Sequence, residues 1–200
     1  MVWNMSALSR IVVFTGSSDG TDPAYFAAAT AVGTAISKAG LGLVYGGGNV
    51  GLMGAIASAS RSAGGEVIGV IPEALVDKEI AHHDLTRLEV VADMHERKMR
   101  MADLSDAFVM LPGGAGTLEE FFEAWTWQQL GIHAKPIAVY DVNGFWRPLN
   151  DLLDTLVSQG FIADRFRDSL IVASDPDELL EKLASWEAPA AKWSAPAGSE

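Results

Sequence analysis

The chain has 200 residues, of which 49% are hydrophobic and 20% are charged, and it contains no cysteine. This length and balance predict one compact domain with a sizeable core. The formal net charge of −12 argues against binding to nucleic acid or to an anionic membrane, because phosphate-rich surfaces attract clustered Lys and Arg. The lack of cysteine excludes disulfides and Cys-ligated zinc. The first ten residues carry no apolar signal segment, and no run reaches the length of a membrane span, so we expect a soluble cytoplasmic protein.

Short apolar runs along the chain, most of them rich in β-branched residues, predict buried strands. These strands are expected at residues 10–16, 41–47, 66–72, 87–91, 106–112, 135–141 and 169–173. Helical signals lie between and after them, at residues 23–39, 52–63, 92–105, 118–130, 145–160 and 175–186. The first helix has the clearest boundaries, with Asp22 as N-cap, Pro23 at the first helical position and Gly40 as the stop.

The alternation of continuously apolar strands with helices predicts an α/β fold, a Rossmann-like doubly wound parallel sheet with helices on both faces. We expect a single domain over residues 10–186, a flexible N-terminus at 1–9 and an Ala/Pro-rich disordered tail at 187–200. In such folds a ligand binds beyond the carboxyl ends of the strands, near the point where the strand order reverses.

Three glycine-containing turns follow predicted strands, at residues 15–20, 45–51 and 112–117. All three should lie on one edge of the sheet. Glycine allows close approach of a ligand to the backbone, and a helix N-terminus beyond it offers N–H groups that suit a phosphate. The candidate ligand contacts in these turns are Gly16, Ser17, Gly46, Gly47, Gly48, Gly113, Gly114, Ala115, Gly116 and Thr117.

The stretch GGGNVG also matches the dinucleotide pattern G-x-G-x-x-G. It lies in the second strand–helix unit, however, and Pro72 disturbs the place of the usual acidic ribose contact. A Walker pattern is absent, because no glycine-rich turn is followed by Lys-Ser or Lys-Thr. A single turn of this kind is better explained as a tight strand-to-helix connection. Three turns on one edge favour a phosphate-binding site.

Two cations lie on or beside the apolar stripe of the helix predicted at 92–105. Met94 and Met101 recur at helical spacing, and Arg97 and Lys98 fall three and four residues after Met94. A buried charge needs an anionic partner or a ligand. The alternative is that both side chains extend past the methionines to water.

The helix after the third turn is apolar nearly all round, with Leu118, Phe121, Phe122 and Trp125 on one side and further apolar residues elsewhere. A sheet covers only one side of a helix, so we expect the other side to contact a partner subunit. Glu119 and Glu120 occupy the first turn of this predicted helix. They are suited either to the helix macrodipole or to the sugar attached to a bound phosphate, and spacing does not choose between them.

The four histidines show no metal-ligand spacing, so we expect no metal site.

The motifs together resemble one family. PGGAGTLEE fits the pattern PGGxGTxxE, and DMHERK resembles the family's MHxRK segment. With YGGGNVGLMG, GVIPEALVDKEI and WTWQQLGIHAKP in this order, the chain is similar to the LOG ("Lonely guy") family of cytokinin riboside 5′-monophosphate phosphoribohydrolases, often mislabelled as lysine decarboxylases. The resemblance covers about residues 10–175. Where the family often has Cys after the first strand, this chain has Thr15.

The resemblance implies hydrolysis of the N-glycosidic bond of a nucleoside 5′-monophosphate without a cofactor, giving free base and ribose 5-phosphate. It implies Arg97 and Glu120 as the catalytic pair and a homodimer with composite sites. The substrate contacts that it implies are Glu79, Met94, Lys98, Gly113, Gly114, Ala115, Gly116, Thr117, Leu118, Glu119 and Thr126.

Two other functions compete with this interpretation. A pyridoxal-dependent decarboxylase would need a Schiff-base lysine, and Lys98 is the lysine near the expected site. A non-catalytic nucleotide sensor, or a carrier like the molybdenum-cofactor carriers, would use a similar glycine-rich fold. The presence of both Arg97 and Glu120 favours the enzyme, because a pure binder does not require a carboxylate beside a phosphate.

Overall fold

The computed structural model describes residues 8–76, 81–82 and 84–193. Within these residues a seven-stranded sheet runs through the molecule in the order β4-β3-β2-β1-β5-β6-β7, and every neighbouring pair is parallel. The strands are β1 (Arg10–Phe14), β2 (Gly42–Tyr45), β3 (Val67–Pro72), β4 (Arg87–Val91), β5 (Ala107–Met110), β6 (Ile137–Tyr140) and β7 (Ile171–Ala173). The predicted parallel sheet is confirmed; β4 has the predicted bounds, and the other strands are shorter than predicted by a few residues.

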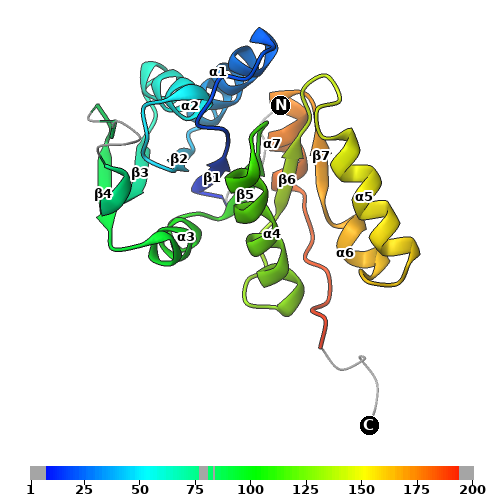
Figure 1. Cartoon of the computed structure of the whole chain (residues 1–200). Helices are drawn as coiled ribbons and strands as arrows, with labels where there is room; N and C mark the ends of the chain where they lie inside the picture. The colour runs from blue at the N-terminus through cyan, green and yellow to red at the C-terminus, as the bar shows by residue number, and fades with distance from the viewer. Residues whose placement is uncertain (1–7, 77–80, 83, 194–200) are drawn as a thin grey trace.

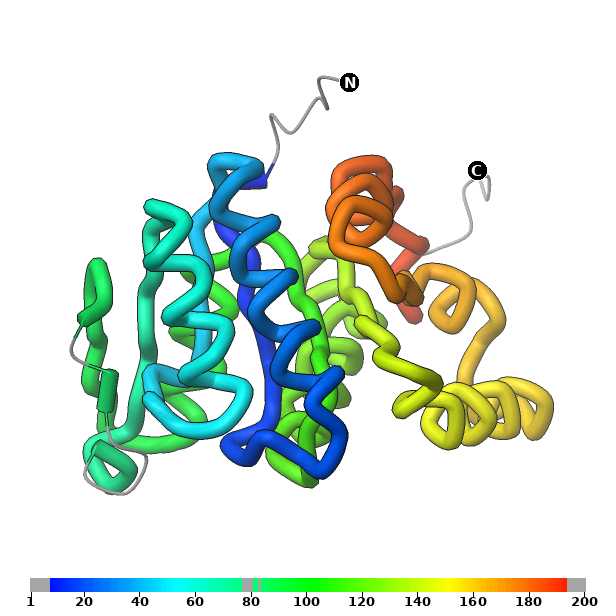
Figure 2. Tube along the Cα trace, turned by 90° about the horizontal axis from the view of Figure 1, so that it is seen from above, coloured from blue at the N-terminus to red at the C-terminus, as the bar shows by residue number. Residues whose placement is uncertain are grey.

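Helices cover both faces of this sheet (Figures 1 and 2). They are α1 (Pro23–Lys38), α2 (Gly51–Ser62), the 3₁₀ turn η1 (Glu73–Leu75), α3 (Met94–Asp103), α4 (Ala115–Leu130), α5 (Arg147–Ser158), α6 (Asp164–Asp168) and α7 (Pro176–Ala184). One core cluster combines α1, α2 and α7 with one set of strand residues, such as Ile11 and Val13. The other combines α3, α4, α5 and α6 with the alternate set, such as Val12 and Phe14. Alternate side chains of a strand point to opposite faces of the sheet, so the two clusters lie on opposite faces. Helices therefore cover both faces of the parallel sheet, and the doubly wound prediction is confirmed.

The strand order reverses between β1 and β5. The chain builds β1 to β4 outward on one side and then returns to place β5 on the other side of β1. Beyond these two strands the loops lie side by side, since Gly16 N donates to Pro112 O at 3.1 Å and Thr15 Oγ1 to the same oxygen at 3.2 Å. The predicted glycine turns of 15–20 and 112–117 therefore meet at the switch point of the sheet.

Helix α1 begins and ends where the sequence predicts. The Asp22 side chain accepts a hydrogen bond from Ala24 N at 2.9 Å, and Pro23 is the first helical residue. Gly40 follows the C-cap with a φ of 77°, in the left-handed region that favours glycine. Farther along, Gly33 faces α2 so closely that an added Cβ would lie 2.5 Å from Ile56 O. This glycine permits the close packing of α1 and α2 that Figure 2 shows.

Three features differ from the sequence expectations. Helix α4 begins at Ala115 rather than 118, because the glycine-rich motif itself forms its first turn. The short α6 was not predicted, since five residues carry little periodic signal. Residues 187–193, expected as part of a disordered tail, lie against the domain: Lys192 N donates to Gln129 O at 2.8 Å and Arg165 Nε to Ala190 O at 3.0 Å.

No helix in the described part of the chain is long and apolar enough to cross a membrane.

We predict that Gly33→Ala destabilises the fold even though alanine is the better helix former. The new methyl group would collide with the α2 backbone, and such overpacking costs about 1–3 kcal/mol, more than the roughly 1 kcal/mol gained in helix propensity. Thermal unfolding should show the loss as a lower Tm. Ala31→Ser on the exposed side of α1 is the control, and an unchanged Tm for Gly33→Ala would contradict the close approach of the two helices.

Candidate active site

Arg97 is held as a buried cation at the edge of the sheet. The N-cap Asp93 starts α3 by accepting from His95 N and Glu96 N, both at 2.9 Å. One turn later the Arg97 side chain is only 5% exposed. Its Nε donates to Val70 O at 3.1 Å and its Nη2 to Gly46 O at 3.0 Å. Carbonyl oxygens from β3 and from the end of β2 therefore fix the guanidinium plane.

The glycines of the second turn make room for this arrangement. A Cβ on Gly46 would overlap the Arg97 guanidinium, and one on Gly51, whose φ is 54°, would overlap the backbone of Ser17. Gly47 has a φ of 80° and packs on Ile71. These contacts give the second turn a packing role beneath the site. Contact of Gly46, Gly47 and Gly48 with a substrate stays a prediction.

The N-terminus of α4 opens onto free space. Its N-cap, Gly114, makes no side-chain cap, so the first N–H groups of the helix point outward. A Cβ on Gly114 or Gly116 would meet no atom within 4 Å, whereas one on Gly113 would overlap Thr117 and lie 2.9 Å from Gly16 N. Gly113 is thus needed for the packing of the loops, whereas Gly114 and Gly116 leave the helix N-terminus accessible to a ligand. This geometry suits an anion at the helix end.

A cavity of about 290 Å³ brings these parts together. Its lining residues are Thr15, Gly16, Ser17, Met53, Leu75, Met94, Arg97, Gly114, Ala115, Gly116, Thr117 and Glu120. A fixed cation, a carboxylate and a helix N-terminus therefore face one space. Glu120, one turn into α4, lines this cavity, whereas Glu119 does not. The geometry separates two glutamates that sequence spacing left equivalent.

Lys98 takes a different direction from Arg97. Its side chain is 7% exposed, and its Nζ contacts Glu119 Oε1 at 2.5 Å and Glu123 Oε2 at 2.9 Å. Burial lowers the pKa of this ammonium, but the hydrogen bonds to the two carboxylates outweigh burial and raise the pKa above its usual value. The alternative in which both cations of α3 extend to water is wrong, because Arg97 and Lys98 are both buried.

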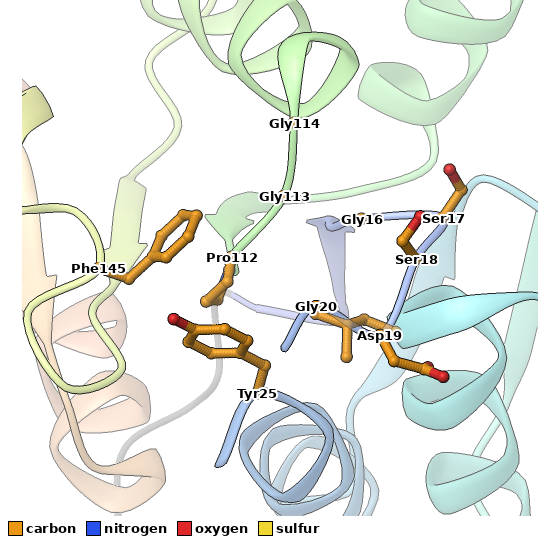
Figure 3. A pocket seen from close by; sticks show the side chains of 11 residues that line it. Gly16, Ser17, Ser18, Asp19, Gly20, Tyr25, Pro112, Gly113, Gly114 and Phe145 are labelled. Carbon is orange, nitrogen blue, oxygen red and sulfur yellow. The ribbon is translucent and has the colours of Figure 1, made fainter. Parts of the chain in front are cut away.

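A second cavity of about 270 Å³ adjoins the first across the Gly16–Gly114 loops (Figure 3). Its apolar side is formed by Tyr25 and Phe145, whose rings lie 5.3 Å apart in an edge-to-face arrangement. Ser17, Ser18, Asp19 and Pro112 complete much of the remaining wall. Gly16, Ser17, Gly113 and Gly114 of the predicted glycine turns also line this cavity, whereas Phe145, in the loop after β6, lies outside the sequence motifs and was not predicted.

Only some of the remaining predicted substrate contacts line the first cavity. Met94 lines the first cavity, but Leu118 and Thr126 do not. Thr126 is exposed, about two turns beyond Glu119 along α4. Glu79 lies outside the described residues. Met53 and Leu75 also line the first cavity; both lie within the family segments YGGGNVGLMG and GVIPEALVDKEI, but neither was predicted as a contact.

No group of three or more His, Asp or Glu residues in the described ranges has a geometry that could hold a metal ion.

Comparisons with known proteins agree with the motifs. A family model described as "Possible lysine decarboxylase" matches residues 53–183. The chain is 45% identical over 181 residues to a probable cytokinin riboside 5′-monophosphate phosphoribohydrolase from Oryza sativa subsp. japonica, covering 90% of this chain and 74% of that protein. It is 44% identical to a cytokinin riboside 5′-monophosphate phosphoribohydrolase from Arabidopsis thaliana (91% and 84% covered) and 46% identical to one from Rhodococcoides fascians (88% and 89% covered).

Solved structures share the architecture at lower identity. A molybdenum cofactor binding protein from Rippkaea orientalis gives a TM-score of 0.65 at 23% identity, over 88% of this chain and 96% of that one. The molybdenum cofactor carrier protein from Chlamydomonas reinhardtii gives a TM-score of 0.65 at 19% identity, over 86% and 93%. At these identities the likeness shows the fold alone.

His133, just beyond α4, should stay neutral well below neutral pH. Its Nε2 lies 3.0 Å from Ala124 O, and its ring stacks on Phe108 at 5.0 Å. Burial, with a smaller contribution from Lys135, lowers its pKa from 6.5 to about 4. The unfolded chain therefore binds this proton first, so stability falls as the pH drops from 6.5 toward 4. NMR should show its ring resonances unmoved between pH 8 and pH 5.5, and a titration midpoint near 6.5 would contradict this environment.

Proposed function

Because the chain belongs to the LOG family of cytokinin riboside 5′-monophosphate phosphoribohydrolases, we propose that it hydrolyses the N-glycosidic bond of N6-modified adenosine 5′-monophosphates, releasing free base and ribose 5-phosphate. One observation carries the proposal to individual residues: Arg97, Glu120 and the open N-terminus of α4 line a single cavity. The helix N-terminus suits the phosphate, and the Glu120 carboxylate suits the ribose beside the bond that is cleaved. Arg97 can orient this carboxylate or contact the substrate.

The 5′-phosphate would bind at the N-terminus of α4, where the outward N–H groups of the first turn and the partial positive charge of the helix favour an anion. Gly114 and Gly116 leave open space there. Thr117 and Ser17 add hydroxyls to the cavity wall. This placement directs the ribose toward Glu120, one helical turn further along α4.

Glu120 would act on the ribose. Cleavage moves the electron pair of the C1′–N bond onto the base, and positive charge develops on the ribose as in glycoside hydrolysis. The Glu120 carboxylate would stabilise that charge and position a water, whose oxygen bonds to C1′; one of its protons is transferred to the departing base and the other stays on the new C1′ hydroxyl. Arg97 is a fixed cation in the same cavity, so it can orient the carboxylate or contact the substrate.

A pyridoxal-dependent decarboxylase, which the family description suggests, fits these residues poorly. A Schiff-base lysine reacts as the neutral amine and is usually activated by a lowered pKa. The pKa of Lys98 is raised by its two carboxylate partners. Burial lowers the pKa of Lys135, but its Nζ donates to Ala102 O at 2.7 Å, and it does not line the cavity.

We further propose a homodimer in which α3 and α4 meet a second copy. Large apolar side chains stay exposed on and beside these helices: Met94 at 39%, Met99 at 59%, Leu130 at 43% and Ile132 at 65%. Thr126 is exposed and does not line the cavity of its own chain, so its implied contact with substrate would be made in the site of another copy.

Glu120→Gln should abolish turnover and spare binding. Loss of the negative charge removes stabilisation that exists only as the ribose becomes cationic, which lowers kcat by about 10²–10⁴-fold. Chromatography would follow base release from AMP and from N6-isopentenyl-AMP, and calorimetry would follow AMP affinity. The ratio of the two wild-type rates distinguishes cytokinin activation from general nucleotide salvage.

The exposed Glu73→Gln serves as the charge control for this test. If wild type binds AMP but releases no base from either substrate, a nucleotide sensor or carrier replaces the enzyme. If Glu120→Gln loses AMP binding together with activity, Glu120 has a structural role instead.

The dimer should depend on the outer face of α3 and α4. Met99→Asp combined with Leu130→Asp places two charges where the second copy would pack, so light scattering should report monomer and base release should fall. The matched control is Leu152→Asp with Phe161→Asp, two apolar residues that are 50% and 77% exposed on the α5 side. A monomeric wild type with full activity would contradict the composite site.

A further inference from the structure

Arg97 and Glu120 face the same cavity from helices that rest on different parts of the sheet. Helix α3 packs on β3 and β4, whereas α4 packs on β1 and β5. The distance between the two proposed catalytic side chains therefore depends on what joins α3 to α4. Because the two helices pack on different strands, side-chain contacts between α3 and α4 must hold them relative to each other.

Lys98 connects the two helices by ion pairs. It follows Arg97 directly in α3, and its Nζ contacts Glu119 at 2.5 Å and Glu123 at 2.9 Å, both on α4. The carboxylates are one helical turn apart, so the ammonium is held against two successive turns of α4. Glu119 in turn directly precedes Glu120. Each end of the bridge is thus one residue from a proposed catalytic side chain.

The burial of the bridge distinguishes it from ordinary surface ion pairs. The Lys98 side chain is 7% exposed, although Glu119 and Glu123 are 53% and 26% exposed. By comparison, the Lys182–Glu178 pair of α7 is more than 40% exposed on both sides. Exposed pairs contribute little, whereas loss of one partner of a buried charge leaves the other without compensation.

A second lysine joins the same two regions at the other end of α3. Lys135, in the segment after α4, donates from Nζ to Ala102 O at 2.7 Å, in the last turn of α3. Helix α3 is therefore held near its middle by Lys98 and near its C-terminus by Lys135. Because Lys135 holds the far end, removal of the Lys98 bridge should tilt or shift α3 and leave the fold intact.

We propose that Lys98, anchored by Glu119 and Glu123, is a positioning residue that sets the separation of Arg97 and Glu120, and that it does not contact the substrate. Glu123 is the new member of the site, outside the PGGAGTLEE motif. The inference rests on the proposed hydrolase function. A misplacement of about 1 Å at a reacting group can cost about 100-fold in rate, so a bridge away from the substrate suffices for a large effect.

Steady-state kinetics on the full-length chain test this role. Lys98→Met should lower kcat about 10- to 100-fold and Glu123→Gln about three- to tenfold, because Glu119 remains in the second variant. KM and AMP affinity should stay within about threefold of wild type in both. Lys98→Glu combined with Glu123→Lys restores opposite charges across the helices and should recover at least about tenfold over Lys98→Glu alone.

Each outcome distinguishes the roles. A raised KM and weakened AMP binding with kcat preserved would make Lys98 a substrate contact and overturn the proposal. So would activity losses that track Tm without recovery in the charge swap, which is the pattern of a purely structural residue. Glu178→Gln, which breaks the exposed pair of α7, is the matched control with unchanged kcat. An inactive wild type would contradict the proposed function itself. If the wild type is active and both Lys98→Met and Glu123→Gln keep its kcat, only the positioning role is contradicted.

Discussion

The burial of the Arg97 guanidinium is the constraint on which the rest of the site depends. A charge removed from water costs several kcal/mol unless hydrogen bonds replace its hydration. Val70 O and Gly46 O supply two such bonds at 3.1 and 3.0 Å. Val70 lies within β3 and Gly46 directly follows β2, and the close approach of Arg97 requires glycine at position 46. The second glycine turn matches the dinucleotide-binding pattern in sequence, but in the structure it holds the Arg97 guanidinium.

The sheet topology determines what faces that cation. Because β5 returns beside β1, the loop after β5 lies on the loop after β1, and Gly16 N bonds Pro112 O. Helix α4 therefore begins at the switch point with its N-terminus toward the cavity and with Glu120 one turn inside. A bound phosphate and a developing ribose cation need opposite charges a few ångströms apart. The α4 N-terminus and the Glu120 carboxylate provide them on one rigid element.

Much of this could be predicted from the sequence because it is local. Asp22, Pro23 and Gly40 mark α1 by chemistry that acts within a few residues. Apolar runs predict the strands, and their alternation with helices predicts the parallel sheet and its ligand-binding edge. The α4 start at Ala115 was missed because glycine disfavours helices, yet here it leaves room at an N-terminus.

The rest could not be predicted because it depends on contacts between distant residues. Nothing in the sequence indicates that Gly46 O and Val70 O hold Arg97, or that Lys98 reaches Glu123. Spacing left Glu119 and Glu120 equivalent, and only the packing of α3 on α4 separates them. Phe145 of the second cavity, 120 residues from Tyr25 in the chain, is a further example.

A crystal structure of the Glu120→Gln variant with AMP would show directly whether the nucleotide binds between the N-terminus of α4 and residue 120. We expect the phosphate at the N-terminus of α4, within hydrogen-bonding distance of the N–H groups of residues 115–117. We also expect that C1′ of the ribose faces residue 120, and that Lys98 still contacts Glu119 and Glu123 rather than the nucleotide. A phosphate bound elsewhere, or a ribose turned away from residue 120, would contradict the proposed roles of the α4 N-terminus and Glu120.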